Sequence, residues 1–317
     1  MRTFDAEAVN AGLDPSRLVA ALREAFQTPA ELPLRHHHTI PGSAEGTEAT
    51  LLLMPAWSAG SSPRYIGIKS VTVHPDDPAK GLPSVQGVYF LLDGQTGTPL
   101  ALIDGPSLTV RRTAAASALA SSYLSRPYSS HLLMIGTGRL VPELIAAHNA
   151  TRPITRVSIW GRNPARATAM AVALSALSLD VTACDYLEAR LRKADVVSFA
   201  TTAKTLVFDG AWLQPGTHVD LVGGFRPNMR EADDTAIRRS TVFVDTHDGA
   251  TREAGDIVRA FESGALSPDQ IAADLFALCR NEHSGRESET EITLFKSVGT
   301  ALEDLAAAAL LMAESAP

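Results

Sequence analysis

The sequence predicts an α/β protein in which a doubly wound parallel sheet is inserted into an α+β domain. Three observations lead to this prediction. An apolar segment in mid-chain ends in a glycine-rich turn, several short apolar segments alternate with helical patterns after it, and the first hundred or so residues show alternating patterns separated by turns. Strands buried on both faces give continuous apolar runs, whereas half-exposed strands alternate. The chain should therefore contain two different sheets.

The N-terminal part should begin with a helix over residues 15–27, with Asp14 as its cap and Pro15 at its first position. Antiparallel strands are expected after it, because β-branched and apolar segments are bounded there by Gly, Pro and Asp. These strands cover residues 50–55, 65–74, 84–93 and 99–104. An alanine-rich helix over about 108–124 then leads into the second part of the chain.

The segment 131–135 is an apolar strand that runs into Gly136, Thr137 and Gly138, and a helical pattern follows. Backbone N–H groups at such a turn and helix start bind a pyrophosphate, so these residues and Arg139-Leu140 are expected to contact a dinucleotide. The third glycine of the usual G-x-G-x-x-G pattern is replaced by Val141, so the motif alone is weak.

The next strand, residues 156–160, supplies a second signal for a dinucleotide. Folds of this type that prefer NAD end this strand with an acid, which binds the ribose 2′-hydroxyl, whereas an arginine favours a 2′-phosphate. This chain has Arg162 followed by Asn163, and no acid. NADP(H) is therefore the preferred cofactor and NAD(H) a possible one, with both residues in the cofactor site. The alternative is that Arg162 is an exposed loop residue.

Further buried strands are expected at residues 180–183, 194–200, 217–222 and 241–245. Ligands bind such sheets at the carboxyl ends of the strands. The residues expected there, around the nicotinamide, are Ala200, Thr201, Thr202, Gly223, Gly224, Phe225, Thr246 and His247, and Val222 is also expected to contact the cofactor. Residues 293–313 are predicted to form one helix that packs back on the N-terminal part. The predicted domains are 1–112 plus 293–317, and 113–292 for the dinucleotide.

Composition limits the classes of protein that the chain can be. It has 317 residues, 45% hydrophobic and 20% charged, with a formal charge of −7, so a nucleic-acid partner is not expected. Cys184 and Cys279 lie far apart, which argues against a disulfide framework or a cysteine-bound metal. The chain starts without a signal-peptide pattern and has no run of roughly 18 apolar residues that could span a membrane. A reducing, cytoplasmic location is therefore expected.

Three cations stand where the pattern calls for apolar or neutral residues: Lys69 within a β-branched strand, Arg112 near the start of the alanine-rich helix, and Arg35. An ammonium among apolar side chains is costly unless an anion meets it, and a guanidinium suits a carboxylate. They are therefore candidate ligands of an acid. The alternatives are exposure on an edge strand for Lys69, a surface helix charge for Arg112 and a solvated charge for Arg35.

No metal site is expected from the run His36-His37-His38, because successive side chains of a strand point to opposite faces. No G-x-S-x-G elbow is present either, so the sequence gives no support for a hydrolase triad.

Several segments, in order along most of the chain, resemble the ornithine cyclodeaminase/mu-crystallin family. They are residues 69–74, GLPSVQG (81–87), DGQTGTPLALIDG (93–105), LTVRRTAAASALASSYL (108–124), IGTG (135–138), IWGRN (159–163), DLVGGFRPNMREADD (220–234) and TLFKSVGTALEDLAAA (293–308). The resemblance implies a homodimer, with a Rossmann domain inserted into a substrate-binding and dimerisation domain. It also implies that Lys69, Arg112 and Arg35 bind the substrate carboxylate.

One departure from the family pattern bears on the activity. Cyclodeaminases of this family resemble one another in an aspartate directly after Gly-Gly, where this chain has Phe225. An apolar ring cannot accept a proton, so the base for amine and water activation is missing. The chain then resembles the ketimine reductase branch, which implies reduction of Δ1-pyrroline-2-carboxylate or Δ1-piperideine-2-carboxylate to L-proline or L-pipecolate. Lys69 and Arg112 would be catalytic, and Phe225 would line the substrate pocket.

Two other functions stay open from the sequence. One is ornithine cyclodeaminase, an NAD-dependent lyase that gives proline and ammonia. The other is an NADPH-dependent small-ligand binding protein of the mu-crystallin type. Dehydrogenases of open-chain amino acids also resemble the chain, and neither ring size nor the direction of reaction can be derived from the residues.

Overall fold

The structure, a computed structural model, describes residues 1–41, 48–59, 64–74 and 76–314. The chain divides into two compact units. The split unit combines Met1–Arg112 with Thr300–Pro317, and the central unit is Thr113–Gly299. Helix α3 (Gly105–Leu124) contains the boundary and starts a few residues earlier than predicted.

The split unit contains a mixed sheet in which most neighbours are antiparallel and β1 runs parallel to β7. Its strand order is β1 (Arg2–Phe4), β7 (Pro99–Asp104), β6 (Val85–Asp93), β5 (Tyr65–Val73), β4 (Ala49–Ser58) and β2 (Ala30–Glu31), with β3 (His36–Ile40) also on β4. All four predicted strands are present. The strand predicted to end at Pro55 continues to Ser58 in β4. Pro55 lies between the stretch of β4 that pairs with β3 and the stretch that pairs with β2, and a missing N–H is tolerated there.

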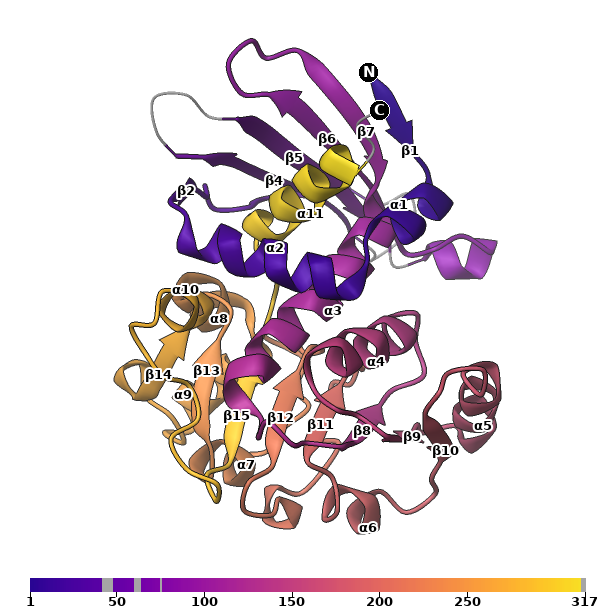
Figure 1. The fold of residues 1–317 in the computed structure, drawn as a ribbon, viewed down its shortest axis with the longest axis vertical. Coiled ribbons are helices and arrows are strands. Elements are labelled where there is room, and N and C mark those ends of the chain that lie inside the picture. Colours follow the sequence, from indigo (N-terminus) through magenta and orange to yellow (C-terminus); the bar gives the residue numbers. More distant parts are fainter. Residues whose placement is uncertain (42–47, 60–63, 75, 315–317) are drawn as a thin grey trace. The chain divides into compact units, whose positions relative to one another are not determined.

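Helices cover one face of this sheet. Helix α2 (Pro15–Gln27) begins at Pro15 as predicted, and the Asp14 side chain accepts a hydrogen bond from the amide of Arg17. Helix α11 (Ala301–Glu314) packs against α2, β4 and β5, with α1 (Ala6–Gly12) nearby (Figure 1). The prediction that the C-terminal helix packs on the N-terminal part is therefore confirmed.

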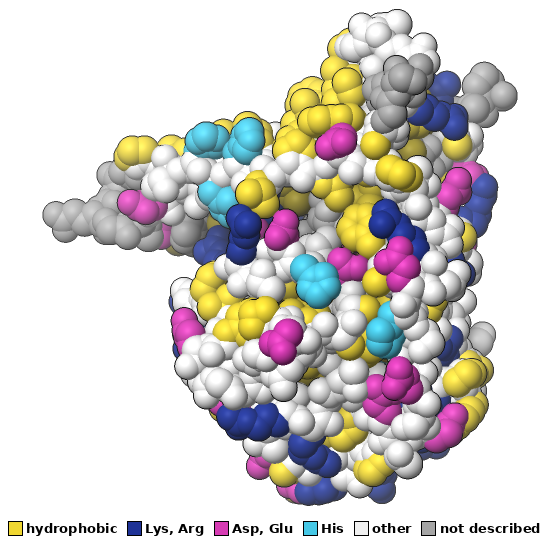
Figure 2. Space-filling model, turned by 90° about the vertical axis from the view of Figure 1, so that its left-hand side faces the viewer, with side chains coloured by type: hydrophobic (Ala, Val, Ile, Leu, Met, Phe, Trp, Pro, Cys, Tyr) yellow, Lys and Arg dark blue, Asp and Glu magenta, His cyan; other side chains and the backbone are white. Residues whose placement is uncertain are grey.

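The other face of the sheet carries apolar side chains at the surface. Along β6, Tyr89 and Leu91 are fully buried, whereas Val88 and Phe90 are 37% and 40% exposed. Side chains alternate between the faces of a strand, so the exposed pair lies opposite the helices. Hydrophobic side chains, drawn in yellow, reach the surface in several places in Figure 2.

The central unit is built on a parallel sheet with the order β10-β9-β8-β11-β12-β15-β13-β14 (Figure 1). Its strands are β8 (His131–Ile135), β9 (Arg156–Trp160), β10 (Asp180–Ala183), β11 (Val196–Phe199), β12 (His218–Leu221), β13 (Thr241–Val244), β14 (Ile271–Asp274) and β15 (Thr293–Lys296). The order reverses at β8, which pairs with β9 on one side and with β11 on the other. This is the doubly wound topology that the sequence predicts.

The helices of the central unit connect these strands. They are α4 (Leu140–Thr151), α5 (Pro164–Ala173), α6 (Leu187–Leu191), α7 (Asp234–Arg238), α8 (His247–Glu253), α9 (Gly255–Glu262) and α10 (Leu275–Cys279). The prediction of one helix over residues 293–313 is wrong, because Thr293–Lys296 form β15 between β12 and β13. The segment is fully buried and apolar apart from its ends, and Gly299, with φ of 81°, separates it from α11.

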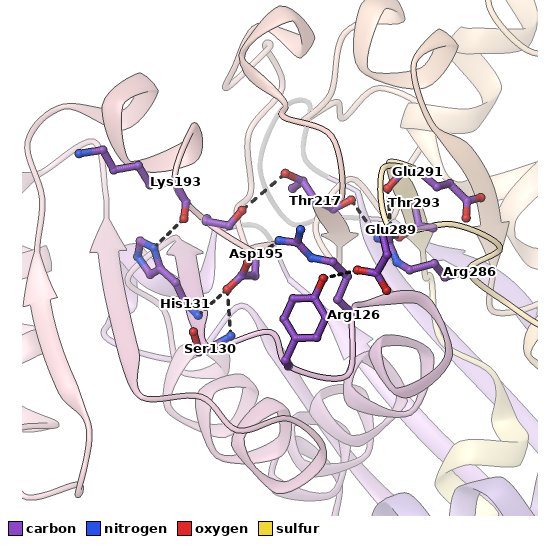
Figure 3. A network of polar contacts seen from close by, with 12 residues as sticks. Arg126, Ser130, His131, Lys193, Asp195, Thr217, Arg286, Glu289, Glu291 and Thr293 are labelled. Atoms are coloured by element: carbon purple, nitrogen blue, oxygen red, sulfur yellow. Dashed lines mark hydrogen bonds and ion pairs between the residues drawn. The ribbon is translucent and has the colours of Figure 1, made fainter.

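Polar contacts fix the amino ends of the parallel strands (Figure 3). The Asp195 carboxylate, just before β11, accepts hydrogen bonds from the amides of Ser130 and His131 at the start of β8 and pairs with Arg126 at 2.6 Å. Arg286 donates to the Thr293 hydroxyl at the start of β15. These contacts bind neighbouring strands together at the end away from the glycine turn, so the sheet presents its carboxyl ends from a rigid base.

Candidate functional site

The turn after β8 is shaped by its glycines. Gly136 has φ of +133°, and a Cβ atom there would lie 2.5 Å from the carbonyl oxygen of Ala200. A Cβ on Gly138 would meet no described heavy atom within 4 Å, so space is open beside the backbone. Helix α4 follows, and its N-cap residue Arg139 makes no side-chain cap hydrogen bond within the described residues. Open space and uncapped amides at a helix start fit a diphosphate.

The end of β9 adjoins this turn. A Cβ on Gly161 would lie 2.7 Å from a methyl carbon of Thr137, so the two turns are in close contact. Arg162 is exposed there, and the side chain of Asn163 accepts a hydrogen bond from the amide of Arg166 and caps α5. Asn163 thus has a structural role that the sequence analysis did not assign, and its amide oxygen is already used.

The other predicted cofactor residues lie at the ends of β11 and β12. Thr201 and Thr202 follow β11, and Val222 and Gly223 follow β12. The amides of Val222 and Gly223 both donate to the carbonyl of Phe199. The structure therefore brings these residues together at neighbouring strand ends, next to the turn after β8.

Among the buried ionisable groups of the central unit, Lys296, Asp256 and Glu231 were not recognised as site candidates from the sequence. Lys296, at the end of β15, donates to the carbonyl of Gly223 and pairs with Asp256 at 3.1 Å. Glu231 accepts hydrogen bonds from the amide and hydroxyl of Thr201. The signal for Lys296 was a cation inside an apolar run, as for Lys69, but a helix prediction concealed it.

In the split unit, Lys69 and Arg112 lie together in a buried group of charges. Lys69 on β5 is 2% exposed and Arg112 on α3 is 6% exposed. The ammonium of Lys69 lies 2.7 Å from Oδ2 of Asp304, and Nε of Arg112 lies 3.0 Å from Oδ1 of the same carboxylate. Nη1 of Arg112 also contacts Glu303 at 2.7 Å. We call these four residues the clamp cluster.

The clamp cluster corrects two interpretations of the sequence. The alternatives of an edge strand for Lys69 and a surface charge for Arg112 are wrong, because both side chains are buried. The two cations also have acidic partners within the chain, supplied by the first turn of α11. Sequence spacing could not indicate this, because Glu303 and Asp304 lie almost two hundred residues beyond Arg112.

Burial and mutual charge alter the protonation of this cluster. Burial lowers the pKa of Lys69 from 10.5 to about 8, Asp304 opposes the shift, and Arg112 and Arg35 add to it. Burial lowers the pKa of Arg112, but the charges of Asp304 and Glu303 outweigh the effect of burial. The pKa of Arg112 is therefore raised overall. Removing one partner of a buried ion pair of this kind strongly destabilises the folded protein, because the other charge stays buried without compensation. Lys69 is thus a cation that can lose its proton as the pH rises through about 8.

Tyr89 lies beside the cluster, opposite Lys69 in the sheet register. Burial and the charge of Asp304 raise its pKa well above the usual value, so the phenol stays protonated. Its hydroxyl has no hydrogen-bond partner among the described residues, and a Cβ on Gly67 would overlap it. The glycine is therefore required for the tyrosine to fit.

The other residues predicted to bind the substrate are Arg35 and Phe225. Arg35 is half-buried and near enough to Lys69 for its charge to act on the ammonium. Phe225 follows Gly224 in the central unit and is 43% exposed, with the guanidinium of Arg226 over its ring at 5.8 Å. The three consecutive histidines of β3 are exposed.

The described residues show no sign of a metal site or of a membrane-spanning helix. Within residues 1–41, 48–59, 64–74 and 76–314, no group of three or more His, Cys, Asp or Glu side chains is arranged to hold a metal ion. In the same part of the chain, every helix is too short or too polar to cross a membrane.

The chain is similar to known proteins along nearly its whole length. It is 38% identical over 311 residues to a protein of Colwellia psychrerythraea named Δ1-pyrroline-2-carboxylate reductase, covering 97% of each chain. A solved structure of the Thermococcus litoralis enzyme of that name, in complex with NADH and L-proline, is also similar to this chain. Its TM-score is 0.92 at 31% sequence identity, and the match covers 99% of this chain and 97% of that one.

An archaeal alanine dehydrogenase dimer with bound NAD has a TM-score of 0.89 at 27% identity, over 99% of this chain and 96% of that one. Both solved structures support the Rossmann-type fold of the central unit. Residues 5–316 match the sequence pattern of one family throughout. The chain belongs to the ornithine cyclodeaminase/mu-crystallin family.

Proposed function

We propose that the protein is an NAD(P)H-dependent ketimine reductase that reduces a small cyclic imino acid, Δ1-pyrroline-2-carboxylate or Δ1-piperideine-2-carboxylate, to L-proline or L-pipecolate. The observation that carries the proposal is the convergence of Lys69 and Arg112 on one buried point of the split unit. The names of the similar Colwellia and Thermococcus proteins, and the NADH and L-proline bound to the latter, support it.

The clamp cluster can bind an acid although its cations are paired. A guanidinium and an ammonium each have more N–H donors than the bonds to Asp304 and Glu303 use. A substrate carboxylate can therefore join the cluster as an additional acceptor. Arg112, Lys69 and Arg35 hold the substrate in this proposal, and such orientation contributes much of the rate of a transfer reaction.

The glycine turn, Thr201, Thr202, Val222 and Gly223 would hold the dinucleotide, together with Arg139, Leu140 and Asn163. When bound, the dinucleotide would supply the hydride for C2 of the imine. The ring nitrogen must carry a proton in the product, and Lys69, with its lowered pKa of about 8, is suited to donate it. Phe225 would form an apolar wall for the ring.

The preference for NADP(H) over NAD(H) is part of the proposal. Arg162 is exposed at the end of β9, and residues 160–166 include no acid to receive a ribose 2′-hydroxyl. An arginine at this position suits a 2′-phosphate. The two similar structures contain NADH and NAD, so use of NAD(H) is also compatible with the family.

Phe225 is also the observation against the lyase reaction. A cyclodeaminase needs a base for the amine and the water, and this ring offers none. The direct experiment follows oxidation of NADPH by the purified protein with each of the two imino acids. Production of ammonia from ornithine without added reductant would favour the lyase, and saturable ligand binding without turnover would favour a mu-crystallin-type binding protein.

We also propose a homodimer that forms through the exposed face of the split-unit sheet. Val88 and Phe90 lie on that face. Exposed apolar patches of this kind are typical of protein interfaces. A second copy is the occupant we favour, because the similar alanine dehydrogenase is a dimer. Phe90→Glu should give monomers in light scattering, whereas Tyr128→Glu, at an exposed tyrosine of the central unit, should not.

The proposed location is the cytoplasm. Cys184 and Cys279 are both buried and neither forms a disulfide, which is compatible with a reducing compartment. Fractionation of cells that express the protein would test the location directly.

A further inference from the structure

Three ionisable side chains of the central unit meet behind the turn that follows β12. Glu231, Asp256 and Lys296 have no exposed surface. They come from three places in the chain: the segment after β12, the first turn of α9 and the last residue of β15. We call them the triad of buried charges. Such a group is costly to bury, so its contacts are informative.

The triad is bonded to both loops at the ends of β11 and β12. Glu231 accepts from the amide of Thr201 at 3.0 Å and from its hydroxyl at 2.7 Å. Lys296 donates to the carbonyl of Gly223. Asp256 accepts from the amides of Glu231 and Ala232 at 2.8 and 2.9 Å, so each member holds backbone in place.

The turn lies directly against these charges. Gly224 has φ of +62°, and a Cβ there would lie 2.5 Å from Oδ2 of Asp256 and 3.2 Å from Nζ of Lys296. The side chain of Glu231 would overlap a Cβ on Gly223. A ligand that rests on Gly223 and Gly224 is therefore separated from the triad by one layer of backbone only.

The triad can exist in two charge states. With both carboxylates ionised its net charge is −1, and with Glu231 protonated it is zero. Burial raises the pKa of Glu231 to about 7; Lys296 opposes the shift, Asp256 adds to it, and the hydrogen bonds from Thr201 oppose it. The charged groups that act on Glu231 are thus Asp256 from α9 and Lys296 from β15. Its chain neighbour Arg230 is paired with Asp234.

We infer that the charge of this triad sets the relative affinity of the protein for the oxidised and the reduced nicotinamide cofactor. The inference rests on the proposed function, in which the nicotinamide occupies the ends of β11 and β12. The oxidised ring carries a positive charge and the reduced ring does not. A buried negative charge close by attracts the former more strongly, because the low dielectric of the interior strengthens the interaction.

Proton binding by Glu231 and cofactor binding are thermodynamically linked, and this fixes the direction of the pH effect. Ionised Glu231 stabilises the oxidised cofactor, so oxidised cofactor binding must in turn favour the ionised carboxylate and release a proton. Above about pH 7 the protein should favour the oxidised form, and below it this advantage should shrink. In the reductive direction the oxidised cofactor is the product, so protonation of Glu231 favours its release.

The test measures dissociation constants for NADP⁺ and NADPH, each by calorimetry, one pH unit below and above about 7. We expect the ratio of the two constants to change by roughly fivefold, at the lower end of known couplings between sites. The rest of the two cofactors is identical, so the ratio isolates the charge of the ring. Glu231→Gln should make the ratio independent of pH and weaken binding of NADP⁺ selectively.

Glu188→Gln is the matched control, because this exposed glutamate on α6 is paired only with Arg192 among the contacts of the described residues. It should leave the ratio and its pH dependence unchanged. If Glu231→Gln does not fold, proton release by the wild-type protein still tests the inference. Calorimetry in buffers of different ionisation enthalpy should detect protons released with NADP⁺ in excess of those released with NADPH.

Each result separates the inference from the proposed function. Binding of both cofactors with a ratio that does not depend on pH, or with equal proton release, overturns the inference and leaves the reductase proposal intact. A ratio that still depends on pH in Glu231→Gln assigns the effect to another group and also overturns it. Absence of binding by either cofactor overturns both.

Discussion

Lys69 and Arg112 contact opposite oxygen atoms of a single buried carboxylate, that of Asp304. One residue is on a strand and the other on a helix, and α11 brings the acid that joins them. The two positive charges are thus held at a fixed separation before any substrate arrives. A site that is organised in this way needs no rearrangement of charged side chains to receive an acid.

Asp304→Asn tests the importance of this arrangement for stability. The substitution leaves two buried cations with less compensation, so the free energy of unfolding should fall by about 3 to 5 kcal/mol. Chemical denaturation followed by fluorescence measures it. Asp248→Asn, at an exposed residue of α8, should change the value little. Equal stability of the two variants would show that the clamp cluster contributes nothing to folding.

Arg112→Ala tests the proposed binding of the substrate carboxylate. Loss of a charged hydrogen-bond donor should raise KM for the imino acid by roughly tenfold to a hundredfold. The dissociation constant for NADPH should stay within about twofold, since another part of the protein is proposed to bind it. Arg111→Ala is the control from the same helix, because Arg111 bonds to Asn10 instead. Similar kinetics for both variants would contradict the proposed role.

The sequence allowed the sheets to be predicted more fully than the clamp cluster. Buried parallel strands are continuous apolar runs, so β8, β9, β11, β12 and β13 could be located from local pattern alone. Lys69 and Arg112 were recognisable because a cation in an apolar segment needs an anion. The identity of that anion depends on which helix packs on which strand, and such long-range pairing leaves no local signal.

The missed strand β15 has a related cause. It is only Thr293–Lys296, and the alanine- and leucine-rich pattern that follows suggested one continuous helix. Strand pairing with β12 and β13 decides its conformation, which is a tertiary effect. Lys296, and with it the triad of buried charges, was overlooked for the same reason.

Arg162→Ala tests the cofactor preference. If Arg162 binds a 2′-phosphate, the dissociation constant for NADPH should rise by roughly tenfold and that for NADH should hardly change. Fluorescence titration of the reduced cofactors gives both values. Arg166→Ala removes a second exposed arginine a few residues away in α5 and should affect neither. An equal loss of affinity for both cofactors after Arg162→Ala would refute the assignment.

The lowered pKa of Lys69 predicts two opposite effects of pH. Activity should decline as the pH rises through about 8, because the ammonium that binds the substrate and donates a proton is lost. Stability should change in the other direction: between about 8 and 10.5 the unfolded chain binds the proton and the folded one does not, so the free energy of unfolding should rise.

Lys69→Arg separates these effects from those of other groups. Arginine stays protonated in this range, so its remaining activity should lose the decline near pH 8, and its stability should lose the corresponding rise. The measurements are kcat/KM for the imino acid and denaturant midpoints across the same pH series. A decline that persists unchanged in Lys69→Arg would mean that another group controls the reaction. The lysine would then be a structural partner of Asp304 only.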